Sequence, residues 1–243
     1  MGKTFDLGKG FNDAIALLTE HMQTILVALG LFTILPAMLM HFFIGSTELN
    51  VNPLAAFSGF NGIWVLVSVL LGMLGSLTIF TAFLTQTKTD LGATISAAAA
   101  MFLPYLLTNI IMWIGIGLGL VLLVIPGIFL MVKLVCASPI VAAEKEKNPI
   151  EALKRSWEMT EGNGMIIFAF LLIIGVGIIV ISWISNLITL GMILNGGVVA
   201  MIGALLAAIV SAITSAISLA AIAAIYRQLA EGVDSAELQE TFG

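Results

Sequence analysis

The chain has 243 residues, of which 60% are hydrophobic and only 9% are charged, with a formal net charge of −5. Water-soluble domains carry about 25% charged residues, so this composition excludes a soluble domain. Several apolar stretches exceed the roughly 20 residues that a helix needs to cross a bilayer. We therefore predict an all-α fold: a polytopic membrane helical bundle forming one membrane domain over residues 1–243.

Six membrane spans and three short interfacial helices are predicted in chain order. The interfacial helices, at about residues 5–20, 91–102 and 149–161, precede spans one, three and five. Pro36 is expected to kink span one. Pro126-Gly127 is expected to form the turn between spans three and four. The spans lie at about residues 22–44, 62–85, 103–125, 128–143, 165–190 and 198–226, followed by a polar tail at 227–243.

The basic residues are distributed on one side of this predicted topology. Every Lys and Arg except Lys133 lies before span one, between spans two and three, between spans four and five, or after span six. Because cytoplasmic loops carry the excess of Lys and Arg, both termini are predicted to be cytoplasmic. The expected location is the bacterial cytoplasmic (inner) membrane, with the protein crossing it several times and exposing very little on the other side.

A short motif recurs before two of the spans. Asp6-Leu7-Gly8 precedes span one, and Asp90-Leu91-Gly92 precedes span three. A repeat of interfacial helix plus helical hairpin, as found in transporters, would explain this recurrence. The matching residues are few, and both a duplication and a chance match stay open.

The segment 149–161 has the features of an amphipathic helix on the cytoplasmic leaflet. Asn148 suits the N-cap position, and Pro149 suits the first helical position. A tryptophan is expected at the level of the lipid headgroups. The predicted apolar face consists of Ile150, Leu153 and Trp157.

The charges of this helix permit two interpretations. Lys154 and Arg155 can meet lipid phosphates at about 1 kcal/mol each, which makes them, with Trp157, candidate contacts for lipid or a partner. Alternatively, the helix is a connector with solvated charges. Oppositely charged residues four apart predict two pairs within the helix, namely Glu151 with Arg155 and Lys154 with Glu158.

Lys133 is the one ionisable residue clearly inside a predicted span. A charge in mid-membrane costs about 2.5 kcal/mol or more. Lys133 follows Gly127 by six residues, or about 9 Å of helix. We expect its side chain to snorkel to the outer interface at that end, or alternatively to bind an anionic headgroup or the carbonyl groups of the Pro126-Gly127 turn.

No residue pattern points to catalysis, a cofactor or a metal. The spans contain no Asp or Glu, and no phosphate-binding loop is present. Asn109 and Asn186 are expected to form hydrogen bonds between helices. Small residues at four-residue spacing allow helices to approach closely. The predicted packing residues are Gly115, Gly119, Gly203, Ala204, Ala208, Ala212 and Ala216.

Residues 125–163 resemble the glycerophosphoryl diester phosphodiesterase membrane-domain family and related uncharacterised bacterial six-span inner-membrane proteins. The resemblance covers about 40 residues: Ile125-Pro126-Gly127-Ile128, Lys133, Pro139, Glu144, Pro149, Glu151 to Trp157, Thr160 and Gly162. In some members this membrane unit is joined to a soluble phosphodiesterase domain. This chain has neither that domain nor its metal-binding carboxylates, so the resemblance implies a membrane unit without the hydrolase activity.

The predicted function is a non-catalytic membrane protein that interacts with lipid or serves as an accessory subunit. The alternative is an uncoupled transporter or facilitator of a lipid or small molecule, and an intramembrane enzyme is the least favoured class. The predicted partners are membrane lipids and no nucleic acid, with a second copy or another membrane protein left open. A polar cavity lined by Lys133, Asn109 or Asn186 would favour transport, whereas a groove near Trp157 would favour the accessory role.

Overall fold

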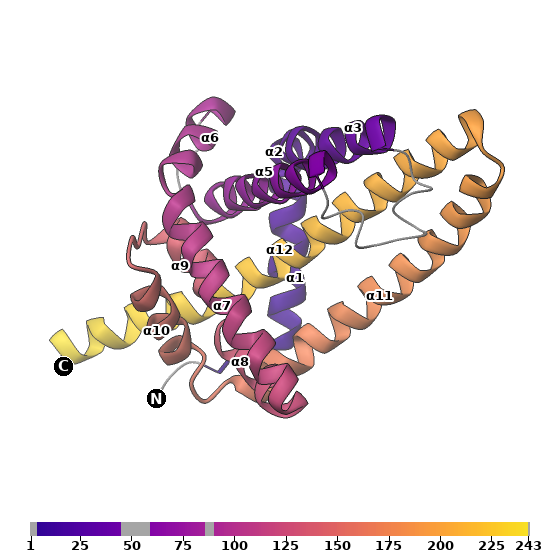
Figure 1. Ribbon diagram of the computed structural model, residues 1–243. Helices are drawn as coiled ribbons and strands as arrows, with labels where there is room; N and C mark the ends of the chain where they lie inside the picture. Colours follow the sequence, from indigo (N-terminus) through magenta and orange to yellow (C-terminus); the bar gives the residue numbers. More distant parts are fainter. Residues whose placement is uncertain (1–3, 45–58, 86–89, 243) are drawn as a thin grey trace. The chain divides into compact units, whose positions relative to one another are not determined.

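The computed structural model describes residues 4–44, 59–85 and 90–242, and it contains no strand within those ranges (Figure 1). Six helices of the described chain are long and apolar enough to cross a membrane. The predicted all-α membrane fold is therefore confirmed. Lys3 and Lys88, which contributed to the predicted topology, lie outside the described residues.

Most helices begin and end close to the predicted positions. Each interfacial helix of the prediction has a counterpart directly before a long apolar helix. In chain order the helices are α1 (Leu7–Glu20), α2 (Met22–Leu29), the π-helix η1 (Gly30–Ile34), α3 (Leu35–Ile44), α5 (Gly59–Leu84), α6 (Leu91–Ala100), α7 (Phe102–Leu122), α8 (Val124–Lys133), α9 (Ala137–Ala143), α10 (Pro149–Met159), α11 (Gly164–Leu194) and α12 (Gly197–Phe242).

The chain divides into two compact units. The first holds Met1–Met22, Leu77–Ile174 and Ile217–Gly243, and the second holds Gln23–Ser76 and Gly175–Ala216. One boundary follows Met22, the first residue of α2, and the others fall inside α5, α11 and α12, so each of these helices contributes to both units.

In the second unit, the proline of span one acts through a π-helical turn. Pro36 lacks an N–H, and its ring would clash with the carbonyl group of Phe32 four residues earlier. The π-helix η1 lies directly before it and widens the helix at this point. A Cβ atom on Gly75 of α5 would lie only 2.8 Å from the Cβ atom of Phe32. The predicted kink therefore takes the form of a π-helical turn against which a glycine of α5 packs.

In the first unit, the turn between spans three and four differs from the prediction. The helix breaks at Leu123, which is extended with φ −156° and ψ 131°, and α8 has already begun when the chain reaches Pro126. Proline is well tolerated in the first turn of a helix because its missing N–H has no intrahelical acceptor there. The predicted turn at Pro126-Gly127 is therefore wrong by three residues. Gly127 instead allows α8 to lie close to α7, since a Cβ atom there would be 2.5 Å from Leu120.

Two other local predictions have different outcomes. The predicted polar tail begins where span six was expected to end, and α12 continues as one helix through this segment to Phe242. The recurring Asp-Leu-Gly motif does precede a helix in both places. The carboxylate of Asp6 caps α1 by accepting the N–H of Lys9 at 2.7 Å, whereas Asp90 makes no such bond at α6.

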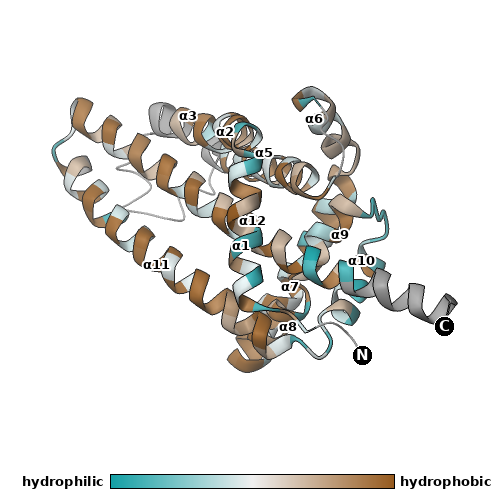
Figure 2. Ribbon diagram, turned by 180° about the vertical axis from the view of Figure 1, so that it is seen from behind, coloured by the Kyte–Doolittle hydropathy of each residue, from teal (hydrophilic) through white to brown (hydrophobic). Residues whose placement is uncertain are grey.

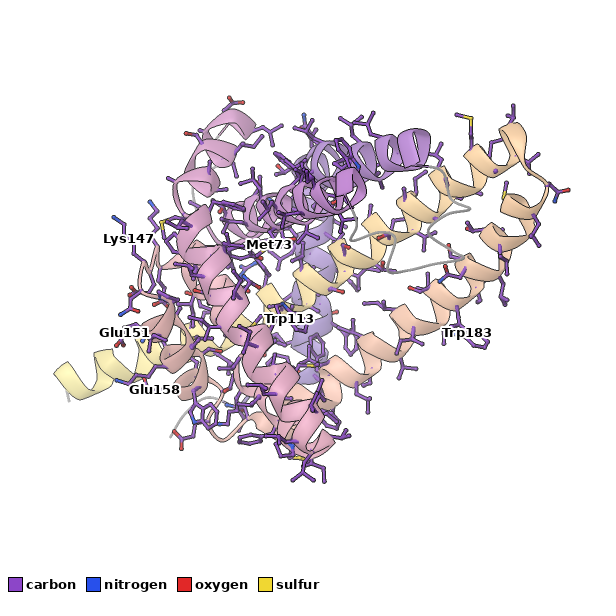
Figure 3. All side chains as sticks on the ribbon, in the orientation of Figure 1. Met73, Trp113, Lys147, Glu151, Glu158 and Trp183 are labelled. Carbon is purple, nitrogen blue, oxygen red and sulfur yellow. The ribbon has the colours of Figure 1, made fainter. Side chains whose placement is uncertain are left out.

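The hydropathy of the helices is consistent with a bilayer around them. Figure 2 shows hydrophobic residues along most of α11, whereas α10 is largely hydrophilic. Large apolar side chains on α11 point outward, including Trp183, which is 72% exposed (Figure 3). In lipid such residues need no protein cover, because lipid tails are as apolar as leucine. The protein is therefore a multi-pass helical membrane protein.

Candidate functional site

Span four is a broken helix, and α10 completes its hydrogen bonding. Between the end of α8 and the start of α9, residues 134–136 are not helical. The hydroxyl group of Ser156 donates to the carbonyl oxygen of Lys133 at 2.9 Å and accepts the N–H of Cys136 at 3.1 Å. The hydroxyl group of Thr160 is 3.3 Å from the same carbonyl oxygen, and it also lies 3.0 Å from the carbonyl oxygen of Ser156 and 3.1 Å from that of Trp157. Irregular backbone at membrane depth is tolerated where protein groups satisfy it, and these two hydroxyl groups do so here.

Sequence reasoning missed this role of Ser156 and Thr160. Both are fully buried, and they lie four residues apart on an otherwise amphipathic helix. Residues four apart lie on one face of a helix, so this spacing next to a short span indicates two hydroxyl groups that face the same neighbour. Their importance depended on the break in span four, which the sequence analysis did not predict.

The buried face of α10 differs from the predicted apolar face. Ala152, Ser156 and Met159 are buried where α10 packs on α7 and α9. Ile150 and Trp157 of the predicted apolar face are 56% and 40% exposed. The N-terminus of the helix matches the prediction, because the side chain of Asn148 accepts the N–H of Ile150 at 3.0 Å and Pro149 follows it.

Lys133 lies among aromatic rings at the end of α8. Its ammonium nitrogen is 5.8 Å from the ring centroid of Phe129 and 5.4 Å from that of Trp157. These rings meet edge to face, with centroids 5.5 Å apart. Only 9% of Lys133 is exposed. The expectation that it snorkels toward the Pro126-Gly127 end is wrong, because its ammonium group points to α10.

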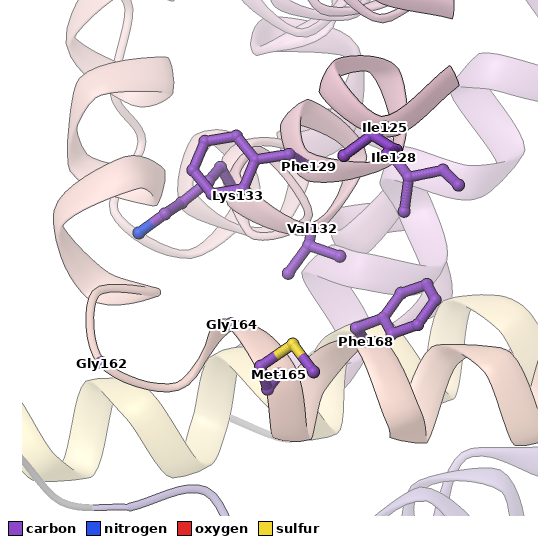
Figure 4. Close-up of a pocket in the computed structure, with 9 residues that line it drawn as sticks. All are labelled: Ile125, Ile128, Phe129, Val132, Lys133, Gly162, Gly164, Met165 and Phe168. Carbon is purple, nitrogen blue, oxygen red and sulfur yellow. The ribbon is translucent and has the colours of Figure 1, made fainter. Parts of the chain in front are cut away.

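A pocket of about 550 Å³ opens beside Lys133, between α8 and the start of α11 (Figure 4). This volume is in the range of about 300–1,000 Å³ that is typical of ligand sites. Apart from the lysine, every lining residue is apolar or a glycine. Sequence reasoning missed the contribution of α11, which folding brings close from a different span. The lining residues are Ile125, Ile128, Phe129, Val132, Lys133, Gly162, Gly164, Met165 and Phe168.

The other predicted contact residues of α10 have different surroundings. Arg155 forms an ion pair with Glu144, with 2.7 Å between its Nε atom and a carboxylate oxygen. The hydroxyl group of Tyr226 donates to the same carboxylate at 3.1 Å. Arg155 therefore joins the start of the loop to α10, and its predicted ion pair with Glu151 stays a prediction. Lys154 is exposed, as are Glu151 and Glu158 on the outer side of α10 (Figure 3).

The N-terminal segment is bound to the edge of the pocket. The backbone N–H of Phe5 donates to the side-chain oxygen of Asn163 at 2.8 Å in a buried hydrogen bond. The Phe5 ring packs edge to face on Phe170 of α11, with centroids 5.2 Å apart. Asn163 lies between Gly162 and Gly164, which both line the pocket. The position of the N-terminal segment and the shape of the pocket edge are therefore linked.

The two span asparagines lie away from this pocket. The side-chain oxygen of Asn109 accepts a hydrogen bond from Ser138 of α9 at 3.3 Å, as expected for a contact between helices. Asn186 donates to the carbonyl oxygen of Ser182, within its own helix. The expected bond from Asn186 to another helix is therefore not among those found in the described part of the chain.

The predicted packing glycines differ in their neighbours. A Cβ atom on Gly119 would lie 2.9 Å from the Cα atom of Gly127, whereas a Cβ atom on Gly115 would have no neighbour within 4 Å. In the second unit, a Cβ atom on Gly203 would lie 2.9 Å from the Cβ atom of Met192. Along α12, Ala204 is half-buried, and Ala208, Ala212 and Ala216 are buried.

Comparison with known proteins gives a family without an assigned activity. No curated protein matches the chain, and no solved structure matches it. One family model, described as a domain of unknown function (DUF7847), matches residues 61–229. That match supports no link to the glycerophosphoryl diester phosphodiesterase membrane-domain family, so the resemblance of residues 125–163 stays a prediction. The matched range includes the broken span, α10 and the pocket, and the chain belongs to the family of the domain of unknown function DUF7847.

Proposed function

We propose that this protein is a non-catalytic, lipid-interacting protein of the bacterial cytoplasmic membrane, acting alone or as an accessory membrane subunit. The observation that carries the proposal is the pocket of about 550 Å³ between α8 and α11. Its wall is apolar, and its single cation is Lys133. A pocket with this lining, on helices that cross a bilayer, suits an amphiphilic molecule better than a polar metabolite.

The exposed side of α10 supports the same proposal. Trp157 is exposed beside the pocket residue Lys133, and Ile150 and Lys154 are exposed on the same helix. Tryptophan and lysine are favoured at the membrane–water interface. Lys133, Lys154 and Trp157 are then the principal lipid contacts, while Arg155 acts mainly by holding α10 to Glu144.

An uncoupled transporter or facilitator is the second candidate, and the break in span four favours it. Transporters commonly bind their substrates at discontinuous helices. Against it, Asn109 and Asn186 do not line the pocket, so the polar cavity that transport would need is not built from them. A flux assay with protein-containing vesicles separates the two functions, because a lipid-binding subunit would produce no flux above that of empty vesicles.

The cytoplasmic location of both termini belongs to the proposal. Cys136, the only cysteine of the chain, is buried, so a Cys136→Ala background permits single-cysteine labelling. Lys147→Cys is expected to react with a membrane-impermeant maleimide only from the cytoplasmic side, and Asn195→Cys only from the other side. The reverse pattern would overturn the orientation without affecting the lipid site.

Native mass spectrometry of the protein extracted in native-lipid discs tests the proposed function directly. A lipid retained in stoichiometric amount would support lipid interaction. A protein retained in stoichiometric amount, without selective lipid, would support the accessory role alone. The absence of both would contradict the proposal. From the resemblance of residues 125–163 to the membrane unit of that phosphodiesterase family, without its soluble phosphodiesterase domain, we further expect that the purified protein does not hydrolyse glycerophosphodiesters.

A further inference from the structure

We infer that the pocket binds an anionic phospholipid whose phosphate lies between the ammonium group of Lys133 and the first turn of α11, with an acyl chain along the apolar wall. This inference rests on the proposed lipid interaction and names the class of lipid and the residues that select it.

The first argument is the unbalanced charge of Lys133. The ion pairs found among the described residues join Lys9 to Glu231 and Arg155 to Glu144, so neither includes Lys133. Its ammonium group has aromatic contacts with Phe129 and Trp157. A buried cation without a carboxylate is costly, and an anion in the pocket would offset that cost.

The second argument is the helix start on the other side of the pocket. The first N–H groups of a helix have no intrahelical acceptor, and they favour an anion. Gly164 and Met165, the first two residues of α11, both line the pocket. A Cβ atom added to Gly162 or Gly164 would meet nothing within 4 Å, so there is room for a headgroup at this end. Figure 4 shows the ammonium group of Lys133 directed to the side of the pocket where Gly162 lies.

The third argument is the length of the apolar wall. Ile128 and Val132 of α8 face Met165 and Phe168 of α11 across the pocket (Figure 4). Ile125, at the far end of the wall, is 81% exposed, so the apolar surface continues outward toward the lipid-facing side. Free phosphate would leave this wall empty. An acyl chain would fill it, which favours a phospholipid over a soluble anion.

The test measures which lipid the protein retains in a bilayer of known composition. The full-length protein is placed in nanodiscs containing equal amounts of phosphatidylglycerol and phosphatidylcholine, and retained lipids are counted by native mass spectrometry. Wild-type protein is expected to retain one phosphatidylglycerol preferentially. Lys133→Met is expected to reduce this preference about tenfold or more, because a hydrogen bond to a charged group is lost. Lys133→Arg, which keeps the positive charge, is expected to retain most of the preference for phosphatidylglycerol.

Two controls separate the parts of the inference. Lys147→Met removes an exposed cation from the loop before α10 and is expected to leave the preference unchanged. Millimolar inorganic phosphate is expected not to displace the lipid, whereas complete displacement would overturn the role of the acyl chain. If Lys133→Met does not fold, the preference retained by Lys133→Arg and its loss in Ile128→Trp, which fills the apolar wall, serve as the test.

The failure of this inference differs from failure of the proposed function. Equal retention of both lipids by the wild-type protein, or an unchanged preference in Lys133→Met, would overturn the anionic site and leave lipid interaction standing. If the wild-type protein retains no lipid from either class, both are overturned.

Discussion

The hydroxyl group of Ser156 lies 2.9 Å from the carbonyl oxygen of Lys133, and this hydrogen bond joins α10 to the break in span four. The same hydroxyl group accepts the N–H of Cys136 at 3.1 Å. One side chain thus satisfies a donor and an acceptor that the end of α8 leaves without helical partners. Because Trp157 is the next residue, the bond also brings its ring close to the ammonium group of Lys133.

Ser156→Ala is expected to destabilise the protein by about 1–3 kcal/mol, because a buried backbone N–H at Cys136 then has no acceptor. The carbonyl oxygen of Lys133 keeps the hydroxyl group of Thr160 at 3.3 Å. Thermal unfolding in detergent or nanodiscs measures the change. Ser96→Ala, at an exposed position of α6, is the matched control and should be close to neutral. Equal stability of both variants would show that the Ser156 bond contributes little.

Two glycines of the same helix are expected to respond differently to alanine. In Gly119→Ala the new Cβ atom would be 2.9 Å from the backbone of Gly127, so α7 and α8 would have to move apart. Overpacking of this kind costs about 1–3 kcal/mol. In Gly115→Ala the Cβ atom meets nothing within 4 Å, and no loss of stability is expected. Comparing the unfolding of the two variants tests the packing of this hairpin, and equal losses would contradict it.

Asn163→Ala is expected to loosen the N-terminal segment. It removes the acceptor for the buried N–H of Phe5, which lies 2.8 Å from the Asn163 side-chain oxygen. An unsatisfied buried donor costs about 1–3 kcal/mol, which corresponds to an increase of tenfold or more in local opening. Hydrogen exchange of the peptide that contains α1 measures this opening. Asn12→Ala, at an exposed position of α1, is the control, and similar exchange in both variants would exclude this role for Asn163.

His21 is expected to make stability depend on pH. Its ring lies 5.6 Å from that of Phe83, and burial lowers the pKa of its imidazole below the ordinary value, with a smaller opposing effect from Glu20 and a further lowering from Arg227. The unfolded chain therefore binds more protons than the folded one as the pH falls below about 6.5, and stability decreases there.

His21→Gln removes the titrating group. The variant is therefore expected to lose less stability than the wild-type protein when the pH falls from neutral to about 5. Melting temperatures of the wild-type protein and the variant across this range provide the measurement. Parallel curves for the two proteins would show that the pH dependence comes from other groups.

The sequence by itself determined the class of fold and the location of most helices. Long apolar stretches have few structural solutions in a bilayer, because backbone groups there must be bonded within the same helix. The start of α10 could also be predicted from the sequence, because Asn148 and Pro149 occupy the capping and first helical positions that these residues favour. These features depend on neighbouring residues along the chain.

Tertiary structure alone decided the arrangement around Lys133. The break in span four became tolerable only because Ser156 and Thr160, more than twenty residues later, supply its missing partners. The ammonium group of Lys133 turned to Trp157 rather than to the nearer end of its own span. The pocket needed the start of α11 as its second wall. Such contacts join residues far apart in the chain, and periodicity and local propensity carry no information about which distant side chains will meet.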